Sequence, residues 1–333
     1  MKTLIIKIDP LRIDEDKLKK ISEVARNGGL VAFPTETVYG LGTNAFKEDA
    51  VRRLFEVKMR PPDNPVSVLV SNFDQVERLA HIDEMARKLM DAFFPGPITV
   101  VMRSKPEVPS IVTAGTGKVA VRMPNHPIAL KIVELAEVPL ATPSANISGK
   151  PSPTKAEHVM EDFMGKIDVI VDGGETGIGI ESTVVDVTSK PPKVLRLGAI
   201  PVEEIEEIIG DVEVVEAPSM KYAHYKPNAK VIIVFGEKRD AVLRKIEELV
   251  KECRLKGLKV GVGLKKMDER IRAEVMVEMG ESVDVYAKNV FNVLREFEQV
   301  DVGIVEGLRG KGLAKAVMNR LLKASDEVID VEG

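Results

Sequence analysis

Cysteine and histidine are scarce in this sequence of 333 residues. Cys253 is the single cysteine, so a disulfide within the chain is excluded and a reducing compartment is favoured. The four histidines, at positions 81, 126, 158 and 224, are scattered and lack the Cys and His spacing of a zinc site. The sequence therefore indicates neither a disulfide-stabilised secreted domain nor a zinc protein.

Long apolar runs are also absent. The N-terminal run Leu4-Ile5-Ile6 is too short for the apolar region of a secretory signal, and Asp9 follows it closely. No other stretch approaches the roughly 20 apolar residues that a membrane-spanning helix needs. We therefore expect a cytoplasmic protein that has no membrane partner.

Neither sign of charge is in large excess. Lysine and arginine total 48 and aspartate and glutamate total 52, so the formal net charge is −4. This balance provides no general attraction to nucleic acid, and runs that interleave arginine with aromatic residues are missing. The Walker phosphate loop Gly-x-x-x-x-Gly-Lys-Ser/Thr is missing too, so an anion site must be built from other residues.

The order of the predicted elements indicates two domains, which agrees with the length of the chain. Residues 1–210 contain several consecutive strands without a helix between them, which predicts a mixed sheet. Residues 211–230 lose this periodicity and are typical of a linker. Strands and helices alternate regularly over residues 231–333, which predicts a smaller, Rossmann-like α/β domain.

The apolar pattern predicts where the individual elements lie. Helices are expected at 14–27, 48–59, 74–94, 127–137, 154–164, 201–209, 238–256, 285–298 and 312–324. Strands are expected at 30–33, 66–70, 98–102, 119–122, 139–142, 169–172, 183–187, 194–197, 231–235, 259–264 and 302–306. Thr154 and Glu157 fit a capping box at the start of the helix at 154–164.

The segment 33–42 combines hydroxyls, a carboxylate, a phenol and two glycines directly after a buried strand. Its glycines alone are typical of a plain turn. The density of polar groups beside the strand favours a loop in which Thr35 or Thr37 faces a ligand.

A pair of cations ends the predicted helix at 48–59. Lys58 and Arg60 alone are typical of a solvated helix C-terminus, because the helix dipole favours positive charge there. The proline-rich segment 61–65 that follows is a stiff turn, which fixes the direction of the cations. Since a guanidinium and an ammonium both suit phosphate or carboxylate, the pair is a candidate anion clamp.

Polar side chains also follow other predicted strands. Arg122 ends an apolar strand, where its charge needs a partner, either a ligand carboxylate or a structural Asp or Glu. Ser144 and Asn146 follow another strand, at the carboxyl edge where α/β sheets bind ligands. The segment 112–118 has the glycines and hydroxyls of an amide nest for phosphate. In the second domain, the glycines at 307–312 fit either an anion-binding loop or a tight start to a helix.

Taken together, these segments resemble the threonylcarbamoyl-AMP synthase family in its two-domain form. The resemblance rests on ordered motifs along nearly the whole chain: P-T-E-T-V-Y-G-L-G at 34–42, K-x-R-P at 58–61, N-P at 64–65, P-G-P at 95–97, V-A-V-R-M-P at 119–124, P-S-A-N at 143–146, P-S-P-T at 151–154, G-x-E-S-T-V-V-D at 179–186, H-Y-x-P at 224–227 and G-x-G-L-A-x-A-V-M-N-R-L at 310–321. It implies an α/β fold in which a YrdC-like twisted mixed sheet with helices precedes the smaller Rossmann-like domain.

The resemblance implies a nucleotidyltransferase that forms L-threonylcarbamoyladenylate and pyrophosphate from L-threonine, bicarbonate or CO2, and ATP. Other proteins would then transfer the threonylcarbamoyl group to a tRNA adenosine. Mg²⁺ is expected to arrive with the ATP phosphates, so no dedicated protein ligands for the metal are expected. We expect no stable tRNA binding by this chain.

The resemblance also implies roles for individual residues. A catalytic clamp around the carbamate and the phosphates would consist of Lys58, Arg60, Ser144 and Asn146. The residues that bind ATP would be Arg60, Asn64, Thr113 or Thr116, Ser144, Ser152, Arg196 and Tyr225. The residues that bind threonine would be Thr35, Thr37, Arg122, Thr142 and Ser182.

The sequence departs from the family pattern at one position of the threonine pocket. Relatives often have histidine where this chain has Leu69, and strand alternation puts Ser67 on the same face as a partial substitute. His224 and Tyr225 in the linker are expected to fold over the site and exclude water.

Two alternative functions stay open at this point. One is an RNA-binding or assembly module with the same fold, which predicts salt-sensitive tRNA binding without threonine. The other is a related enzyme that uses carbamoyl phosphate and ignores threonine.

Overall fold

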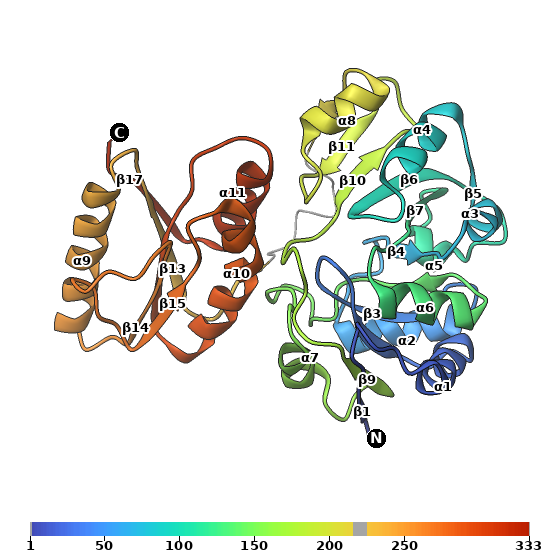
Figure 1. Ribbon diagram of the computed structural model, residues 1–333, viewed down its shortest axis with the longest axis horizontal. Coiled ribbons are helices and arrows are strands. Elements are labelled where there is room, and N and C mark those ends of the chain that lie inside the picture. Colours follow the sequence, from blue (N-terminus) through green and yellow to red (C-terminus); the bar gives the residue numbers. More distant parts are fainter. Residues whose placement is uncertain (1, 216–224, 333) are drawn as a thin grey trace. The chain divides into compact units, whose positions relative to one another are not determined.

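The computed structural model describes residues 2–215 and 225–332, which form two compact units (Figure 1). The first unit takes in Met1–Ser148, Ser152–Gly177 and Glu181–Lys221. The second takes in Tyr222–Gly333 together with two short earlier segments, Gly149–Pro151 and Ile178–Ile180. No helix in the described ranges is long and apolar enough to cross a membrane.

The first unit is built on a mixed sheet of 12 strands, in the order β1-β9-β2-β3-β8-β4-β7-β6-β10-β11-β12, with β5 paired to β6. These strands are β1 (Leu4–Lys7), β2 (Val31–Pro34), β3 (Tyr39–Asn44), β4 (Ser67–Leu69), β5 (Ala80–His81), β6 (Ile98–Ser104), β7 (Lys118–Arg122), β8 (Leu140–Ala141), β9 (Val169–Asp172), β10 (Thr183–Asp186), β11 (Lys193–Arg196) and β12 (Glu213–Val214). Parallel pairs such as β4 with β7 alternate with antiparallel pairs such as β2 with β3. The predicted mixed sheet is confirmed.

Eight helices accompany this sheet in the described part of the first unit. They are α1 (Glu15–Arg26), α2 (Glu48–Lys58), α3 (Phe73–Leu79), α4 (Glu84–Phe93), α5 (Ser110–Thr113), α6 (Pro127–Ala136), α7 (Ala156–Phe163) and α8 (Val202–Ile209). In α1 the side chain of Asp14 accepts a hydrogen bond from Lys17 N at 3.1 Å and caps the helix. Figure 1 shows α1 beside α6.

Two hydrophobic clusters cover the opposite faces of the sheet. Side chains alternate across a strand, so Ala32 of β2 belongs to one cluster and its neighbours Val31 and Phe33 belong to the other. The larger cluster also contains Tyr39 and Leu41 of β3, both fully buried. The strands that carry the polar site residues are therefore held rigidly from both sides.

The loop predicted within 33–42 is mostly a strand. Val31 of β2 pairs with Gly42 and Pro34 pairs with Tyr39, so β2 and β3 form a hairpin whose turn includes Thr35. Glycines at alternate positions hide the strand pattern in the sequence. They are needed because a Cβ on Gly40 would lie 2.5 Å from Cγ2 of Thr142.

Two other local predictions are wrong. The single helix expected at 74–94 is divided into α3 and α4, because Asp83 accepts a hydrogen bond from Ala86 N at 2.8 Å and starts a new helix. The capping box at Thr154 does not form. The N-cap of α7 is Lys155, and Thr154 N instead donates to Nδ1 of His158 at 3.2 Å.

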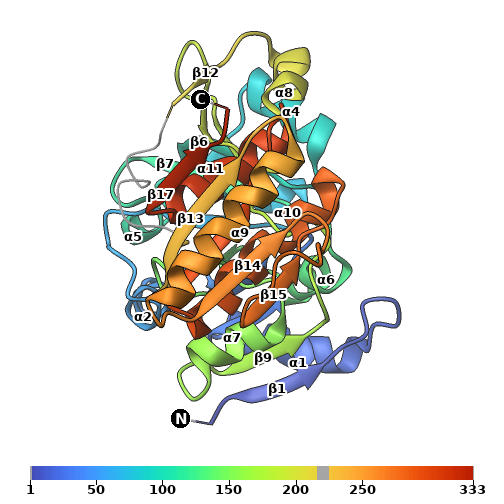
Figure 2. The same ribbon diagram turned by 90° about the vertical axis from the view of Figure 1, so that its left-hand side faces the viewer.

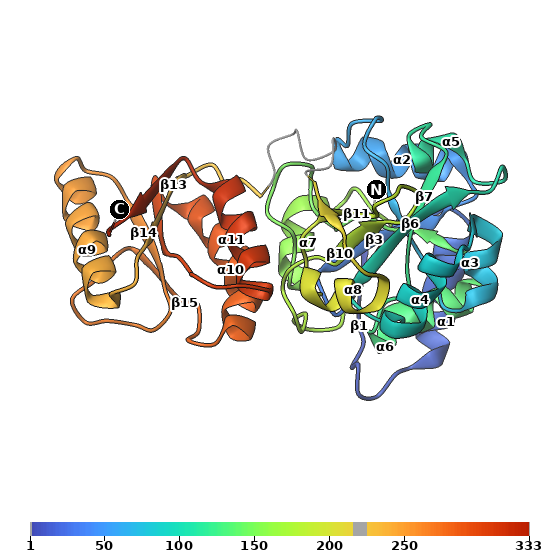
Figure 3. The same ribbon diagram turned by 90° about the horizontal axis from the view of Figure 1, so that it is seen from above.

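The second unit has a five-stranded parallel sheet in the order β15-β14-β16-β13-β17. Its elements are β13 (Lys230–Phe235), α9 (Arg239–Leu255), β14 (Val260–Leu264), β15 (Val275–Glu278), α10 (Val283–Glu296), a 3₁₀ helix (Phe297–Gln299), β16 (Val302–Glu306), α11 (Leu313–Ala324) and β17 (Glu327–Asp330). Helix α9 lies across one face of this sheet (Figure 2), and α10 and α11 cover the other (Figure 3). The predicted Rossmann-like α/β fold is confirmed, and the two edge strands β15 and β17 are additions to it.

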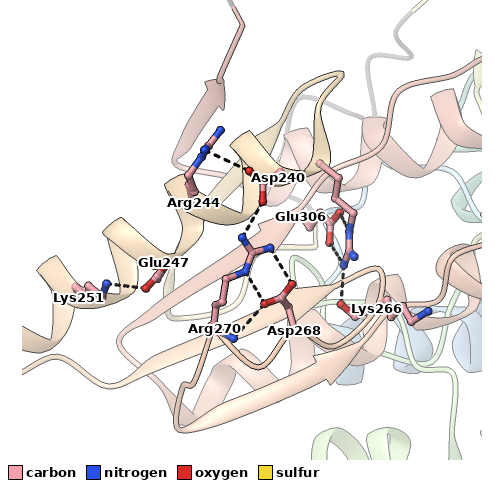
Figure 4. Close-up of polar contacts among 9 residues, drawn as sticks. Asp240, Arg244, Glu247, Lys251, Lys266, Asp268, Arg270 and Glu306 are labelled. Carbon is pink, nitrogen blue, oxygen red and sulfur yellow. Dashed lines mark hydrogen bonds and ion pairs between the residues drawn. The ribbon is translucent and has the colours of Figure 1, made fainter.

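A polar network ties the loop after β14 to the start of α9 (Figure 4). Arg270 contacts Asp268 at 2.9 Å and Asp240 at 2.7 Å. The hydrogen bonds that its side chain and its backbone N–H donate to Asp268 lower the pKa of Asp268 to about 2. Beside it, Arg239 Nε lies 2.9 Å from the buried carboxylate of Glu306 at the end of β16. The cations of this edge are thus neutralised by protein carboxylates.

The glycines at 307–312 form a tight start to α11. Gly312 is the N-cap and adopts a left-handed φ of 57°, which favours glycine. Arg309 in the same loop contacts Asp330 at 2.7 Å. A role as an anion-binding loop stays a prediction.

Candidate active site

A cavity of about 110 Å³ lies in the first unit. It is lined by side chains from the β2–β3 hairpin, from β4, β6 and β7, and from the segments around β8, β10 and β11: Thr35, Val38, Tyr39, Gly40, Arg60, Ser67, Leu69, Thr99, Arg122, Thr142, Pro143, Ser144, Glu181, Ser182 and Arg196. Three arginines and one glutamate leave a formal excess of two positive charges in its wall. Such a wall is suited to an anionic ligand.

The segment after β8 brings Ser144 and Asn146 beside β3. Thr142 N donates to Ser67 O at 2.7 Å, and Leu41 N donates to Pro143 O at 2.9 Å. Gly40 forms a β-bridge to Ser144, so the segment runs directly along β3. The close approach of the two backbones explains why β3 has glycine at position 40.

Lys58 holds this segment from behind. Its side chain is 1% exposed, and Nζ donates to the carbonyl oxygens of Ser144, at 2.5 Å, and of Asn146. Backbone N–H of Ser148 also donates to the carbonyl oxygen of Lys58 at 2.8 Å. The cation at the end of α2 is therefore buried and bound to backbone, which rules out the solvated helix terminus that the residue alone would indicate.

Arg60 lies in the wall of the cavity, one residue beyond the left-handed Met59 that ends α2. Its guanidinium donates to Asn64 O at 3.0 Å, to Asn64 Oδ1 at 2.8 Å and to Pro65 O at 2.6 Å. The proline-rich turn thus fixes the direction of Arg60, as the sequence predicts. Burial, and next the charge of Arg196, lower the pKa of Arg60 to about 10, so it stays charged at neutral pH.

A chain of hydrogen bonds links Arg196, Ser182 and Thr99 in another part of the wall. Arg196 donates through Nε to Ser182 O and through Nη2 to Ser182 Oγ, both at 3.0 Å. The hydroxyls of Ser182 and Thr99 are 2.8 Å apart. Thr99 was not predicted as a site residue, because it lies within the otherwise apolar strand predicted at 98–102.

Arg122 faces the cavity from the end of β7 and has a protein partner. Its Nη2 lies 2.7 Å from Oε2 of Glu36, and the two side chains are 9% and 11% exposed. A structural carboxylate partner, one of the two alternatives that the sequence left open, is therefore present. Arg122 also lines the cavity, so a ligand carboxylate can reach the same guanidinium.

Glu181 is a site residue without a role in the sequence analysis. It lines the cavity, is 5% exposed, and its Oε1 accepts a hydrogen bond from Ser152 Oγ at 2.7 Å. The predicted ATP ligand Ser152 thus does not line the cavity itself but contacts Glu181, which does. Tyr39 is a second such residue; its hydroxyl donates to Gly174 O at 2.7 Å, and burial raises its pKa.

The cavity brings together seven predicted residues from distant parts of the chain: Thr35, Arg60, Arg122, Thr142, Ser144, Ser182 and Arg196. Ser67 and Leu69 also face it together, as strand alternation predicts. Other predicted residues do not line the cavity but contact residues that do. They are Lys58 and Asn146, which contact Ser144, Asn64, which contacts Arg60, Ser152, which contacts Glu181, and Thr37, whose Oγ1 lies 2.9 Å from Thr35 Oγ1.

Three predicted ATP ligands lie outside this wall. Thr113 ends α5, and Thr116 Oγ1 donates to Thr113 O at 2.7 Å in a loop with two left-handed glycines. Tyr225 belongs to the second unit and is buried there, with its ring centroid 5.1 Å from that of Phe291. His224 lies outside the described residues.

Among the described residues, no group of three or more His, Cys, Asp or Glu side chains could hold a metal ion. A metal in this site would therefore depend mainly on oxygens supplied by a ligand and on water.

Family models match both units of the chain. Residues 23–198 match the family described as telomere recombination, which comprises Sua5, YciO and YrdC proteins. Residues 200–326 match the family described as the C-terminal domain of threonylcarbamoyl-AMP synthase. The chain belongs to the threonylcarbamoyl-AMP synthase family.

Threonylcarbamoyl-AMP synthases from two prokaryotes support this assignment over nearly the full chain. The protein from Pyrococcus abyssi is 51% identical over 97% of this chain and 98% of its own length. The protein from Bacillus subtilis is 40% identical over 95% of each chain. The predicted enzyme class is therefore confirmed. The chain is a threonylcarbamoyl-AMP synthase, which is a nucleotidyltransferase that uses ATP and acts in tRNA modification.

A solved structure agrees with the fold of the whole chain. The crystal structure of P. abyssi Sua5 complexed with L-threonine is 50% identical, covers 98% of this chain and 99% of its own, and superimposes with a TM-score of 0.94. The predicted two-domain form of the family is therefore confirmed.

Proposed function

We propose that the arginine-lined cavity of the first unit is where L-threonine, bicarbonate or CO2, and ATP react to form L-threonylcarbamoyladenylate and pyrophosphate. The observation that supports this most directly is the convergence of Arg60, Arg122 and Arg196 on one small cavity. The substrates carry a carboxylate, a carbamate and a triphosphate, so the reaction requires several cations around one centre.

In the proposed reaction, the amine of threonine first combines with CO2 and loses a proton, which gives a carbamate. A carbamate oxygen then attacks the α-phosphorus of ATP, and the bond from that phosphorus to the bridging oxygen of pyrophosphate breaks. Two anions must meet in this step, so fixed positive charge and aligned donors lower its barrier. The protein needs no covalent nucleophile for either step.

Arg122 is the proposed ligand of the threonine carboxylate. It lines the cavity and offers a planar fork of N–H groups that matches a carboxylate. Thr35, Thr142 and Ser182 supply hydroxyls nearby for the amine and hydroxyl of the substrate, and Thr37 supports Thr35 at 2.9 Å. Binding of L-threonine by P. abyssi Sua5, half of whose sequence is identical, is consistent with this assignment.

Arg60 and Ser144 are the proposed clamp on the carbamate and the phosphates, with Lys58 and Asn146 completing it. Arg60 and Ser144 lie in the wall, whereas Lys58 binds the backbone on both sides of Ala145. In this arrangement Lys58 fixes the position of Ser144 and Asn146 and adds a buried positive charge behind them.

ATP is proposed to contact Arg60, Arg196 and Ser144 through its phosphates. Asn64, Thr113 or Thr116, Ser152 and Tyr225 are the further proposed contacts. We propose that Mg²⁺ binds with ATP through the phosphate oxygens and waters, since this ion keeps several waters when it binds nucleotides. Its positive charge would then supplement that of the arginines.

The adenylate product is proposed to pass to the proteins that transfer the threonylcarbamoyl group to tRNA. Stable tRNA binding by this chain is not expected, because its net charge of −4 provides no general attraction to nucleic acid. A gel shift at low and high salt tests this alternative role: salt-sensitive tRNA binding in the absence of threonine would support an RNA-binding module.

Mass detection of the adenylate tests the proposed function, with each substrate omitted in turn. We expect the product only when threonine, bicarbonate and ATP are all present. Product formation from carbamoyl phosphate without threonine would instead support the second alternative enzyme.

A further inference from the structure

Glu36 and Arg122 form a buried ion pair at the inner wall of the cavity. Glu36 lies in the turn between β2 and β3, and Arg122 is the last residue of β7, a strand that does not pair with either of them. Their side chains are only 11% and 9% exposed, and the charged atoms are 2.7 Å apart. Glu36 stands behind Arg122, since Arg122 lines the cavity and Glu36 is not among its lining residues.

The ion pair with Glu36 leaves N–H groups of the Arg122 guanidinium without a hydrogen bond to the described residues. Nε and Nη2 of Arg122 are buried and make no hydrogen bond with the described residues, although Nη2 is in ion-pair contact with Glu36. A guanidinium has five N–H donors, so one carboxylate behind it leaves donors for a second carboxylate in front. Buried donors of this kind require a functional or structural explanation.

Arg122 supplies the positive charge that is paired with the buried carboxylate of Glu36. The carboxylate of Glu36 also acts on His126, the N-cap of α6: burial lowers the pKa of His126, and the negative charge of Glu36 partly opposes this shift. A buried charge that loses the opposite charge paired with it is strongly destabilising. The orientation of Arg122 and the charge of Glu36 are therefore coupled.

The three arginines of the wall differ in what holds them. Arg60 donates to uncharged amide oxygens of Asn64 and Pro65, and Arg196 donates to oxygens of Ser182. Arg122 is held by an ion pair with the carboxylate of Glu36. With one carboxylate already beside it, Arg122 attracts a triphosphate less than it would without Glu36.

We propose that Glu36 is a positioning residue for threonine. It fixes the guanidinium of Arg122 so that the remaining N–H groups point toward the substrate carboxylate. Its negative charge also partly offsets that of Arg122, so this end of the cavity suits a singly charged carboxylate better than a triphosphate. This inference rests on the proposed role of Arg122 as the ligand of the threonine carboxylate.

The test is a double-mutant cycle on the full-length protein, measured as pyrophosphate release. Glu36→Gln keeps the shape of the side chain and removes its charge. We expect it to raise the threonine KM about tenfold, because a misplaced binding group is costly, and to change the ATP KM and kcat by less than about twofold. Glu36→Asp keeps the charge and should lie between Glu36→Gln and the parent protein.

Arg122→Gln supplies the second arm of the cycle. It should raise the threonine KM by more than Glu36→Gln does, and adding Glu36→Gln to it should change the threonine KM no further. Glu137→Gln is the matched control, because Glu137 is an exposed carboxylate in an ion pair with Arg26. It should leave both KM values unchanged.

Each failure has a distinct meaning. If Arg122→Gln raises the threonine KM and Glu36→Gln does not, the positioning role is wrong and the role of Arg122 stands. If Arg122→Gln leaves the threonine KM unchanged, the proposed carboxylate site itself is wrong. If Glu36→Gln alone fails to fold, the double variant is compared with Arg122→Gln, and a further rise in threonine KM in the double variant overturns the proposal.

Discussion

The ammonium nitrogen of Lys58 lies 2.5 Å from the carbonyl oxygen of Ser144, a residue 86 positions later in the chain. The same nitrogen donates to the carbonyl oxygen of Asn146, so one buried cation joins the end of α2 to the segment that follows β8. Two motifs that are far apart in the sequence thus form one unit. The proposed clamp depends on this link.

Replacement of Lys58 by methionine is expected to loosen the segment from Ser144 to Asn146. The two carbonyl oxygens lose a charged donor, and Ser144 is no longer held in the wall. We expect kcat/KM for ATP to fall about 100-fold, measured as pyrophosphate release. Lys47→Met is the control, because this exposed lysine donates only at the surface, to Asn27 O; an equal loss in both variants would contradict the prediction.

Arg60→Ala is expected to lower threonine- and bicarbonate-dependent pyrophosphate release by about 10²–10³-fold, the cost of removing an oriented donor. The side chain lines the cavity and is fixed by three hydrogen bonds to Asn64 and Pro65. Arg52→Ala removes an exposed arginine from α2, the helix that precedes Arg60, and should leave turnover unchanged. Turnover of Arg60→Ala close to that of the parent protein would contradict the clamp.

Gly40→Ala is expected to disturb the threonine pocket through sterics alone. The new Cβ would lie 2.5 Å from Cγ2 of Thr142, a branched side chain that cannot easily rotate away. We expect a loss of about 1–3 kcal/mol in the free energy of unfolding, together with a raised threonine KM. Gly177→Ala is the control, since the atom closest to its Cβ would be 3.8 Å away.

The ion pair between Lys118 and Asp186 is expected to make the first unit sensitive to acid. Burial by itself raises the pKa of Asp186, but hydrogen bonds from Lys118 and Thr188 outweigh it, so the pKa is lowered overall. A lowered carboxyl pKa stabilises the fold above the ordinary pKa near 4 and loses this effect as the pH falls through the folded value. Lys118→Met should therefore cost about 1 kcal/mol at pH 7, since Lys118 is 40% exposed, and much less at pH 3.

Urea unfolding at the two pH values measures this difference. The midpoint of Lys118→Met should lie below that of the parent protein at pH 7, and the two midpoints should approach each other at pH 3. The same gap at both values would show that the pair does not act through the charge of Asp186.

Much of the fold could be predicted from the sequence because apolar spacing is a local property. The helix predicted at 127–137 and the strand predicted at 169–172 match α6 and β9 within one residue. Where the local pattern is weak, prediction failed. The glycines of β3 hide its alternation, and the edge strands β15 and β17 have only four residues each.

The candidate site, like the fold, could be predicted only in part from the sequence. Residue types and motif order were enough to select Arg60, Arg122, Ser144 and Arg196, and these do share one cavity. The partner of Arg122 could not be selected, because Glu36 is one of many carboxylates in the chain and its neighbours are not sequence neighbours. Glu181 lies within the motif at 179–186, but the sequence assigns it no role for the same reason.

The sequence by itself determined the family, most of the strands and helices, and a set of candidate polar residues for the reaction. Each of these depends on residue type and spacing along the chain. Only the tertiary structure decided that Lys58 turns inward to backbone carbonyls while Arg60 faces the cavity, and that Arg122 is paired with Glu36. The direction of a charged side chain depends on which oxygens the folded chain brings within reach of it, and that information is absent from local sequence.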